Sequence, residues 1–204
     1  MTCFASPRGR GPPLCPACRP SRWWAIPRGN GLHDFGRIWR QDPLRDVRSP
    51  ERKVRPFADH LARGIAVDFP DQISEVSDEL LEKWGVTFDE ALEIGRDNLW
   101  KRSAGKWEHL AEGVWMSPWQ DNLDVNRLAM PTLFRQLTVD GDPIAFAPNR
   151  DHLIVTGSRN FVGQGVAAAY AIGLLDEPRP MNATPIILDG LEWKAYPFDT
   201  NHPI

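Results

Sequence analysis

Proline, glycine and arginine crowd the start of this chain, and that crowding limits where regular structure can begin. Residues 1–56 contain 9 of the 19 prolines. Proline removes a backbone hydrogen-bond donor, and glycine raises the entropic cost of ordering. A run such as ASPRGRGPPLCPACRPSRWWAIPRGNG (residues 5–31) shows no periodicity. The sequence therefore predicts a largely disordered segment over 1–56 and a folded domain over 57–204.

Charge is distributed just as unevenly along the chain. Residues 1–63 hold 13 Lys and Arg against 5 Asp and Glu, a balance of +8. Residues 64–204 hold 11 against 22, a balance of −11, which leaves the net charge of −3. An acidic domain binds phosphate backbones poorly by itself. Any contact with nucleic acid is therefore expected only through the basic segment.

Three interpretations of residues 1–56 follow from their composition. The segment can be a flexible basic arm that contacts nucleic acid or acidic partners, with Trp23 and Trp24 available for stacking. An Arg-rich targeting peptide is less favoured, because proline and glycine break the amphipathic helix it needs. The third interpretation is a misassigned start, because codons for Arg, Pro, Gly, Trp and Cys are typical of GC-rich upstream DNA.

A fourth interpretation of the segment is a zinc knuckle. It uses the C-x₂-C unit of Cys15 and Cys18, with Cys3 and His33 as distant ligands. Structural zinc sites usually use two such pairs, and only one exists here. All three cysteines lie within the first 18 residues, so the remainder of the chain contains no internal disulfide. We predict no metal site and no cofactor.

The composition is that of a soluble globular protein, with 42% hydrophobic and 25% charged residues. No apolar run approaches the roughly 18–20 residues that cross a bilayer. The first residues also lack the continuous apolar core of a secretory signal. We therefore expect a cytoplasmic protein without membrane contact.

Two consecutive helices are predicted together with their ends. In SDELLEKWG, Ser77 can cap the first helix and Gly85 can end it in a left-handed conformation. Thr87 and Glu90 have the spacing of a capping box at the start of the second. One face of this second helix is apolar at helical spacing, and consists of Phe88, Ala91, Leu92, Gly95 and Leu99.

The other segments alternate between helix and strand signals. We expect a short helix and then a strand over 57–70, an edge strand or extended segment over 113–119, and a helix over 121–137. Asp121 or Asn122 would cap that helix, and Pro131 would kink or restart it. Strands at 144–147 and 153–156, a helix at 161–175 and a hairpin at 184–198 complete the chain, with Asp189-Gly190 as the hairpin turn. This mixture predicts a single compact α+β domain of helices and antiparallel hairpins.

Two stretches resemble the YtpQ-type family of bacterial proteins. ISEVSDELLEKWGVTFDEALEIGRDNLWKRSA is similar to the family's course from a strand into a helix ending in W-G and a helix containing N-L. The stretch DNLDVNRLAMPTLFRQLTVDGDPIAFAPNRDHLIVTGS is similar to its D…R-L…G-x-P…P-x-R-D-x-L pattern. The resemblance covers about 70–195 and implies a cytoplasmic α+β domain without assigned catalytic residues. Such proteins open with an ordered helix and strands, and their absence over 1–56 supports a misplaced start.

Four consecutive polar residues, Asn149, Arg150, Asp151 and His152, separate two apolar runs. The favoured interpretation is a hairpin loop whose Asn and Asp side chains bond neighbouring backbone amides. The alternative is a hydrolase-like site that uses Asp151 and His152 with Ser158 as nucleophile. Adjacent strand residues point to opposite faces, and Ser158 lacks the G-x-S-x-G elbow, so we do not favour catalysis.

Five tryptophans lie within 36 residues, which exceeds what a small core obviously needs: Trp84, Trp100, Trp107, Trp115 and Trp119. Aromatic residues are enriched at sites that bind partners. We expect Trp115 and Trp119, which flank Ser117-Pro118, to be exposed. The leading hypothesis is a non-catalytic module that binds a protein or peptide through these residues, with the binding set Trp115, Trp119, Asn149, Arg150, Asp151 and His152.

Overall fold

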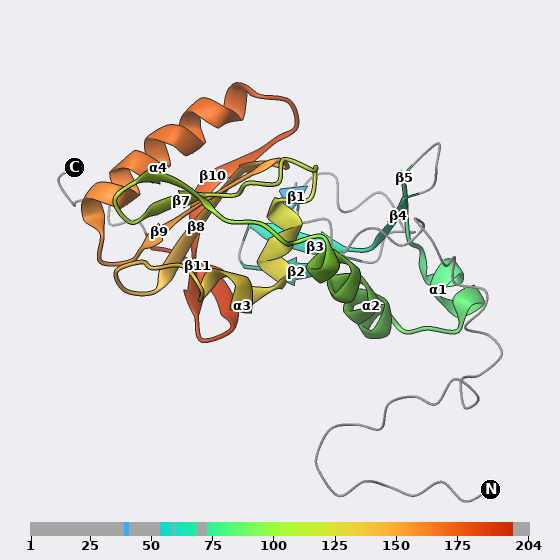
Figure 1. The fold of residues 1–204 in the computed structure, drawn as a ribbon. Coiled ribbons are helices and arrows are strands. Elements are labelled where there is room, and N and C mark those ends of the chain that lie inside the picture. Colours follow the sequence, from blue (N-terminus) through green and yellow to red (C-terminus); the bar gives the residue numbers. More distant parts are fainter. Residues whose placement is uncertain (1–38, 41–53, 59, 69–72, 198–204) are drawn as a thin grey trace, which may run out of the picture.

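The structure is a computed structural model that describes residues 39–40, 54–58, 60–68 and 73–197 (Figure 1). Most of the basic segment lies outside these ranges. The predictions of disorder, of a nucleic-acid arm and of a zinc site at Cys15 and Cys18 therefore fall outside the described residues.

The largest element is a six-stranded antiparallel sheet with the order β11-β10-β8-β9-β7-β6. Its strands are β6 (Glu108–Ala111), β7 (Val114–Met116), β8 (Pro143–Asn149), β9 (His152–Gly157), β10 (Pro180–Asp189) and β11 (Glu192–Ala195). The predicted hairpins at 144–156 and 184–198 are confirmed. The predicted edge strand at 113–119 is wrong in one respect, because β7 lies between β9 and β6, and β6 forms the edge.

Alternating side chains of the central strand β8 divide the core between the two faces of the sheet. Ile144 and Phe146 pack beneath helix α4 (Phe161–Gly173), whereas Ala145 and Ala147 belong to the core on the opposite face. Figure 1 shows α4 lying across one face of this sheet. Both faces of β8 are therefore buried, as the apolar run of its sequence requires.

The second face of the sheet is covered by a short 3-10 helix, η3 (Val125–Ala129), and by α3 (Pro131–Phe134). Pro131 occupies the first turn of α3, so the prediction that it restarts a helix is confirmed. The predicted cap is wrong. Asp121 instead accepts a hydrogen bond from the Leu123 amide and pairs with an arginine six residues later.

A small sheet with the order β1-β3-β2 packs beside this core; its strands are β1 (Trp39–Arg40), β2 (Val54–Phe57) and β3 (Leu61–Gly64). The helix predicted after residue 57 is wrong, because Ala58 adopts φ 49° and turns the chain into the buried strand β3. Strand β1 and most of β2 lie within residues 1–56, the segment that the sequence predicts to be largely disordered. Pro56 is tolerated because β2 is an edge strand of this sheet.

Helices α1 (Asp78–Trp84) and α2 (Phe88–Lys101) form a second, smaller core with Ile65 and Val76. These two residues flank the hairpin of β4 (Ala66–Asp68) and β5 (Ile73–Glu75). Both predicted helix starts and the Gly85 end are confirmed, including the reciprocal capping box of α2. Helix α2 joins the two cores: Phe88 packs in the smaller one and Leu99 in the larger. The described chain is therefore the predicted α+β domain.

Candidate ligand-binding groove

The polar loop between β8 and β9 is organised by its first residue. Asn149 is 1% exposed, and its Oδ1 accepts a hydrogen bond from the Asp151 amide at 3.0 Å and lies 2.9 Å from His152 Nδ1. Its Nδ2 donates to the Leu174 carbonyl at 3.0 Å. Arg150 lies in the same turn, and its carbonyl accepts from the Val125 amide at 3.5 Å. The side chain of Asn149 therefore stabilises the hairpin turn.

The structure does not bring the hydrolase-like residues together. His152 begins β9 and Ser158 follows its last residue, and six residues of extended strand span about 20 Å. Ser158 Oγ accepts a hydrogen bond from the Asp142 amide at 2.9 Å, at the far end of the β8–β9 hairpin. A nucleophile and base so separated cannot share a proton.

Trp115 and Trp119 are half-buried, and the N–H group of each indole has an acceptor. Trp115 donates to the Thr138 carbonyl at 3.1 Å, and Trp119 to the Ala104 carbonyl at 3.0 Å. Among the tryptophans whose burial the structure describes, Trp100 is the exposed one, at 51%. The exposed indole thus lies on α2, away from the predicted pair.

Trp100 borders an open groove of about 680 Å³. Four segments that are distant in sequence form its walls: the β2–β3 hairpin, the C-terminal half of α2, the η3–α3 segment and the turn between β10 and β11. Its lining consists of residues 56–58, Arg63, Arg96, Asp97, Trp100, 128–132 and 191–193.

Hydrogen bonds to backbone carbonyls fix two of these walls together. Trp193, which is 6% exposed, donates from its indole to the Leu128 carbonyl at 2.8 Å and so joins β11 to η3. Arg135, just after α3, donates to the carbonyl of Gly190 in the β10–β11 turn. These two walls of the groove are therefore held against each other by hydrogen bonds between segments distant in sequence.

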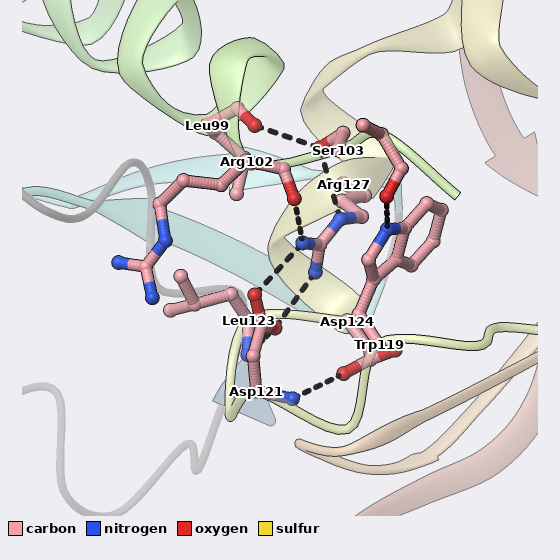
Figure 2. Close-up of polar contacts among 9 residues, drawn as sticks. Leu99, Arg102, Ser103, Trp119, Asp121, Leu123, Asp124 and Arg127 are labelled. Carbon is pink, nitrogen blue, oxygen red and sulfur yellow. Dashed lines mark hydrogen bonds and ion pairs between the residues drawn. The ribbon is translucent and has the colours of Figure 1, made fainter.

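A buried arginine holds the third wall, the end of α2, against the η3 segment (Figure 2). Arg127 is fully buried, and its two Nη atoms donate to the two carboxylate oxygens of Asp121 at 2.9 Å. It also donates to the Ser103 hydroxyl at 3.0 Å and to the Arg102 carbonyl at 3.2 Å. Its guanidinium lies 4.0 Å from the ring centroid of Trp119. Every part of the side chain is engaged, so we assign it a structural role.

This network carries two carboxylates, the partly buried Asp121 and the fully buried Asp124, whose pKa values shift in opposite directions. Burial alone would raise the pKa of Asp121, but the hydrogen bonds and charge of Arg127 outweigh it and hold that pKa below its ordinary value. Burial raises the pKa of Asp124, since its hydrogen bonds and the Arg127 charge compensate only in part. Asp121 is therefore the carboxylate partner of Arg127.

The groove also holds a cation that makes no salt bridge among the described residues, Arg63. Arg63 Nε is buried and has no hydrogen-bond partner among the residues that the structure describes. The neighbouring Arg55 pairs with Asp89, and Arg96 pairs with Glu93. Burial, and then the charge of Arg55, lowers the pKa of Arg63. Of the three, Arg63 is the arginine without a salt bridge in the described part of the chain; its guanidinium lies 5.9 Å from the ring centroid of Phe57, and the charge of Asp89 offsets its own in part.

Sequence reasoning did not single out Trp100 or Arg63. The signal for Trp100 was present, because it follows Leu99 on α2 and so points about 100° away from the apolar face. No local signal marks Arg63, whose surroundings come from α2 and β2.

No family model matches the chain, and no curated protein or solved structure is significantly similar to it. Within the described ranges, no group of three or more His, Cys, Asp or Glu side chains is placed to hold a metal ion. None of the helices in the same ranges is both long and apolar enough to cross a membrane.

Proposed function

We propose that this chain is a non-catalytic module that binds a segment of a protein or peptide partner in the groove beside Trp100. One observation carries the proposal: the exposed indole borders a groove, and two of the other walls of this groove are joined to each other by side-chain hydrogen bonds. Tryptophan loses little conformational entropy on binding and is enriched among residues that dominate interface energies.

The dimensions and chemistry of the groove support a peptide ligand. A volume of about 680 Å³ lies within the usual range of roughly 300–1,000 Å³ for binding sites. Trp100 and Leu191 are 51% and 63% exposed on two of its walls, and the buried Trp193 contributes to its lining. Exposed apolar side chains that flank a concave surface lose water when a partner covers them. The groove can therefore take one large apolar side chain of a partner.

This proposal keeps the predicted function, a non-catalytic module that binds a protein or peptide, but moves the binding surface to the groove beside Trp100. The set around Trp115 and Trp119 is replaced, because their indoles are committed to carbonyls of the domain itself. On the resemblance alone, we also propose a cytoplasmic bacterial protein of YtpQ type. Nucleic-acid contact by residues 1–56 stays a prediction, tested by salt-sensitive binding that is lost when residues 1–38 are deleted.

Selection from a random peptide library against the full chain tests the groove. Peptides that are enriched should bind the Trp100→Ala variant at least about tenfold more weakly, as expected for a central aromatic contact. Tyr170→Ala is the matched control, because Tyr170 is similarly exposed, at 48%, but lies on α4. Selected peptides that bind Trp100→Ala as tightly as the unmodified chain would overturn the proposal.

A further inference from the structure

We propose that the groove recognises a carboxylate borne by an apolar or aromatic residue, and that Arg63 receives this carboxylate. The inference rests on the proposed function and specifies its ligand: a peptide segment with one negative charge beside a large apolar side chain. Trp100 and Trp193 would contact the apolar part.

The first argument is the pairing of the arginines near the groove. Arg55 contacts both carboxylate oxygens of Asp89, and its guanidinium lies 4.7 Å from the ring centroid of Phe88. Arg96 pairs with Glu93 one helical turn away. Arg63 lines the same groove and has no salt bridge to any carboxylate among the described residues. It is therefore the arginine available to a ligand.

The second argument is the partial desolvation of the Arg63 guanidinium charge. The Nε atom of Arg63 is buried and unbonded within the described part of the chain, and a buried donor without an acceptor loses its hydration without compensation. The planar guanidinium presents two parallel N–H groups that match the two oxygens of a carboxylate. Because Nε is closed to solvent, a carboxylate in the groove would pair with the Nη groups of Arg63 and neutralise the charge that they share with Nε.

The remaining charges of the groove limit how negative the ligand can be. Asp97 and Glu192 also line it and are exposed. Both would repel a dianionic phosphate more strongly than a carboxylate with a single charge. The balance of one cation without a salt bridge against two acidic side chains therefore favours a carboxylate.

A pair of small probes that differ only in charge tests the inference. N-acetylphenylalanine carries an aromatic ring and a carboxylate, and N-acetylphenylalaninamide carries the same ring without the charge. Both are titrated into the ¹⁵N-labelled full chain, and the Arg63 Nε–Hε and Trp100 indole N–H resonances are followed by NMR. Inorganic phosphate forms the third titration and separates a general anion site from a carboxylate site.

The acid should bind at least about tenfold more tightly than the amide, because a charge-assisted bidentate pair is among the strongest hydrogen-bonding arrangements. The Arg63 resonance should move with the acid and stay in place with the amide. Arg63→Gln should abolish the preference for the acid. Arg96→Gln, which changes an arginine of the same groove that is already paired, should preserve it.

Equal binding of acid and amide, or a preference that survives Arg63→Gln, would overturn the inference and leave the groove proposal intact. Failure of the acid to bind, or tighter binding of phosphate than of the acid, would overturn it as well. Because the Arg63 resonance is followed in the unmodified chain, its response to the acid and the amide tests the inference even if a variant does not fold. The groove proposal itself fails only on the Trp100→Ala comparison with selected peptides.

Discussion

Replacing Arg127 with methionine tests whether the buried network holds the domain together. Methionine retains most of the length of the side chain but removes its charge and its hydrogen bonds to Asp121, Ser103 and the Arg102 carbonyl. Breaking a buried ion pair by removing one partner costs about 3–5 kcal/mol, because the other charge stays desolvated. Asp121 retains 23% side-chain exposure, which lets water reach it. We therefore expect about 3 kcal/mol.

Urea unfolding at pH 7, followed by tryptophan fluorescence, measures this loss as a shift in midpoint at constant slope. Arg159→Met is the matched control, because Arg159 makes the same 2.9 Å pair with Asp140 while its side chain is 74% exposed. An exposed pair contributes at most about 1 kcal/mol. The reasoning is refuted if Arg127→Met costs no more than Arg159→Met.

Three further predictions concern stability. The pKa of Asp121 is depressed in the folded state, so ionised Asp121 stabilises the fold above the ordinary pKa of 3.8, and this stabilisation is lost as pH falls through the folded pKa. Urea titrations from pH 7 to pH 2 should therefore show a smaller decrease in unfolding free energy with falling pH for Asp121→Asn than for the unmodified chain. Trp193→Phe keeps one aromatic ring but removes the pyrrole ring with its N–H, so the buried Leu128 carbonyl loses its donor. The free energy of unfolding in urea should fall by about 1–3 kcal/mol, and an unchanged midpoint would contradict this. Thr87→Ala removes the capping box with Glu90 and should cost about 1 kcal/mol, measured in the same way, with Thr132→Ala as control.

Local chemistry made part of the fold predictable from the sequence. Ser77, Gly85 and the pair Thr87–Glu90 act within one helical turn, so their roles could be assigned without knowing the tertiary structure. The same holds for the turn at Gly190, which adopts φ 61°. Continuous apolar runs likewise located β8 and β9, because both strands are buried on two faces.

The features that failed prediction depend on partners distant in sequence. Strand β2 contains Pro56 and no apolar alternation, and it forms because it pairs with β3 at the edge of a sheet. Arg127 looks like an exposed helix residue until Ser103 and Asp121 are placed around it. Trp119 was expected to be exposed for the same reason, since the carbonyl of Ala104 that accepts its indole N–H lies 15 positions away.

The most direct test of the central claim is the set of intermolecular NOEs between a selected peptide and the indole rings of the full chain. The account predicts NOEs from the large apolar side chain of the peptide to Trp100 and to the methyl groups of Leu191. NOEs to Trp115, or to Phe161 and Tyr170 on α4, without any to Trp100 would place the partner on another surface and contradict it.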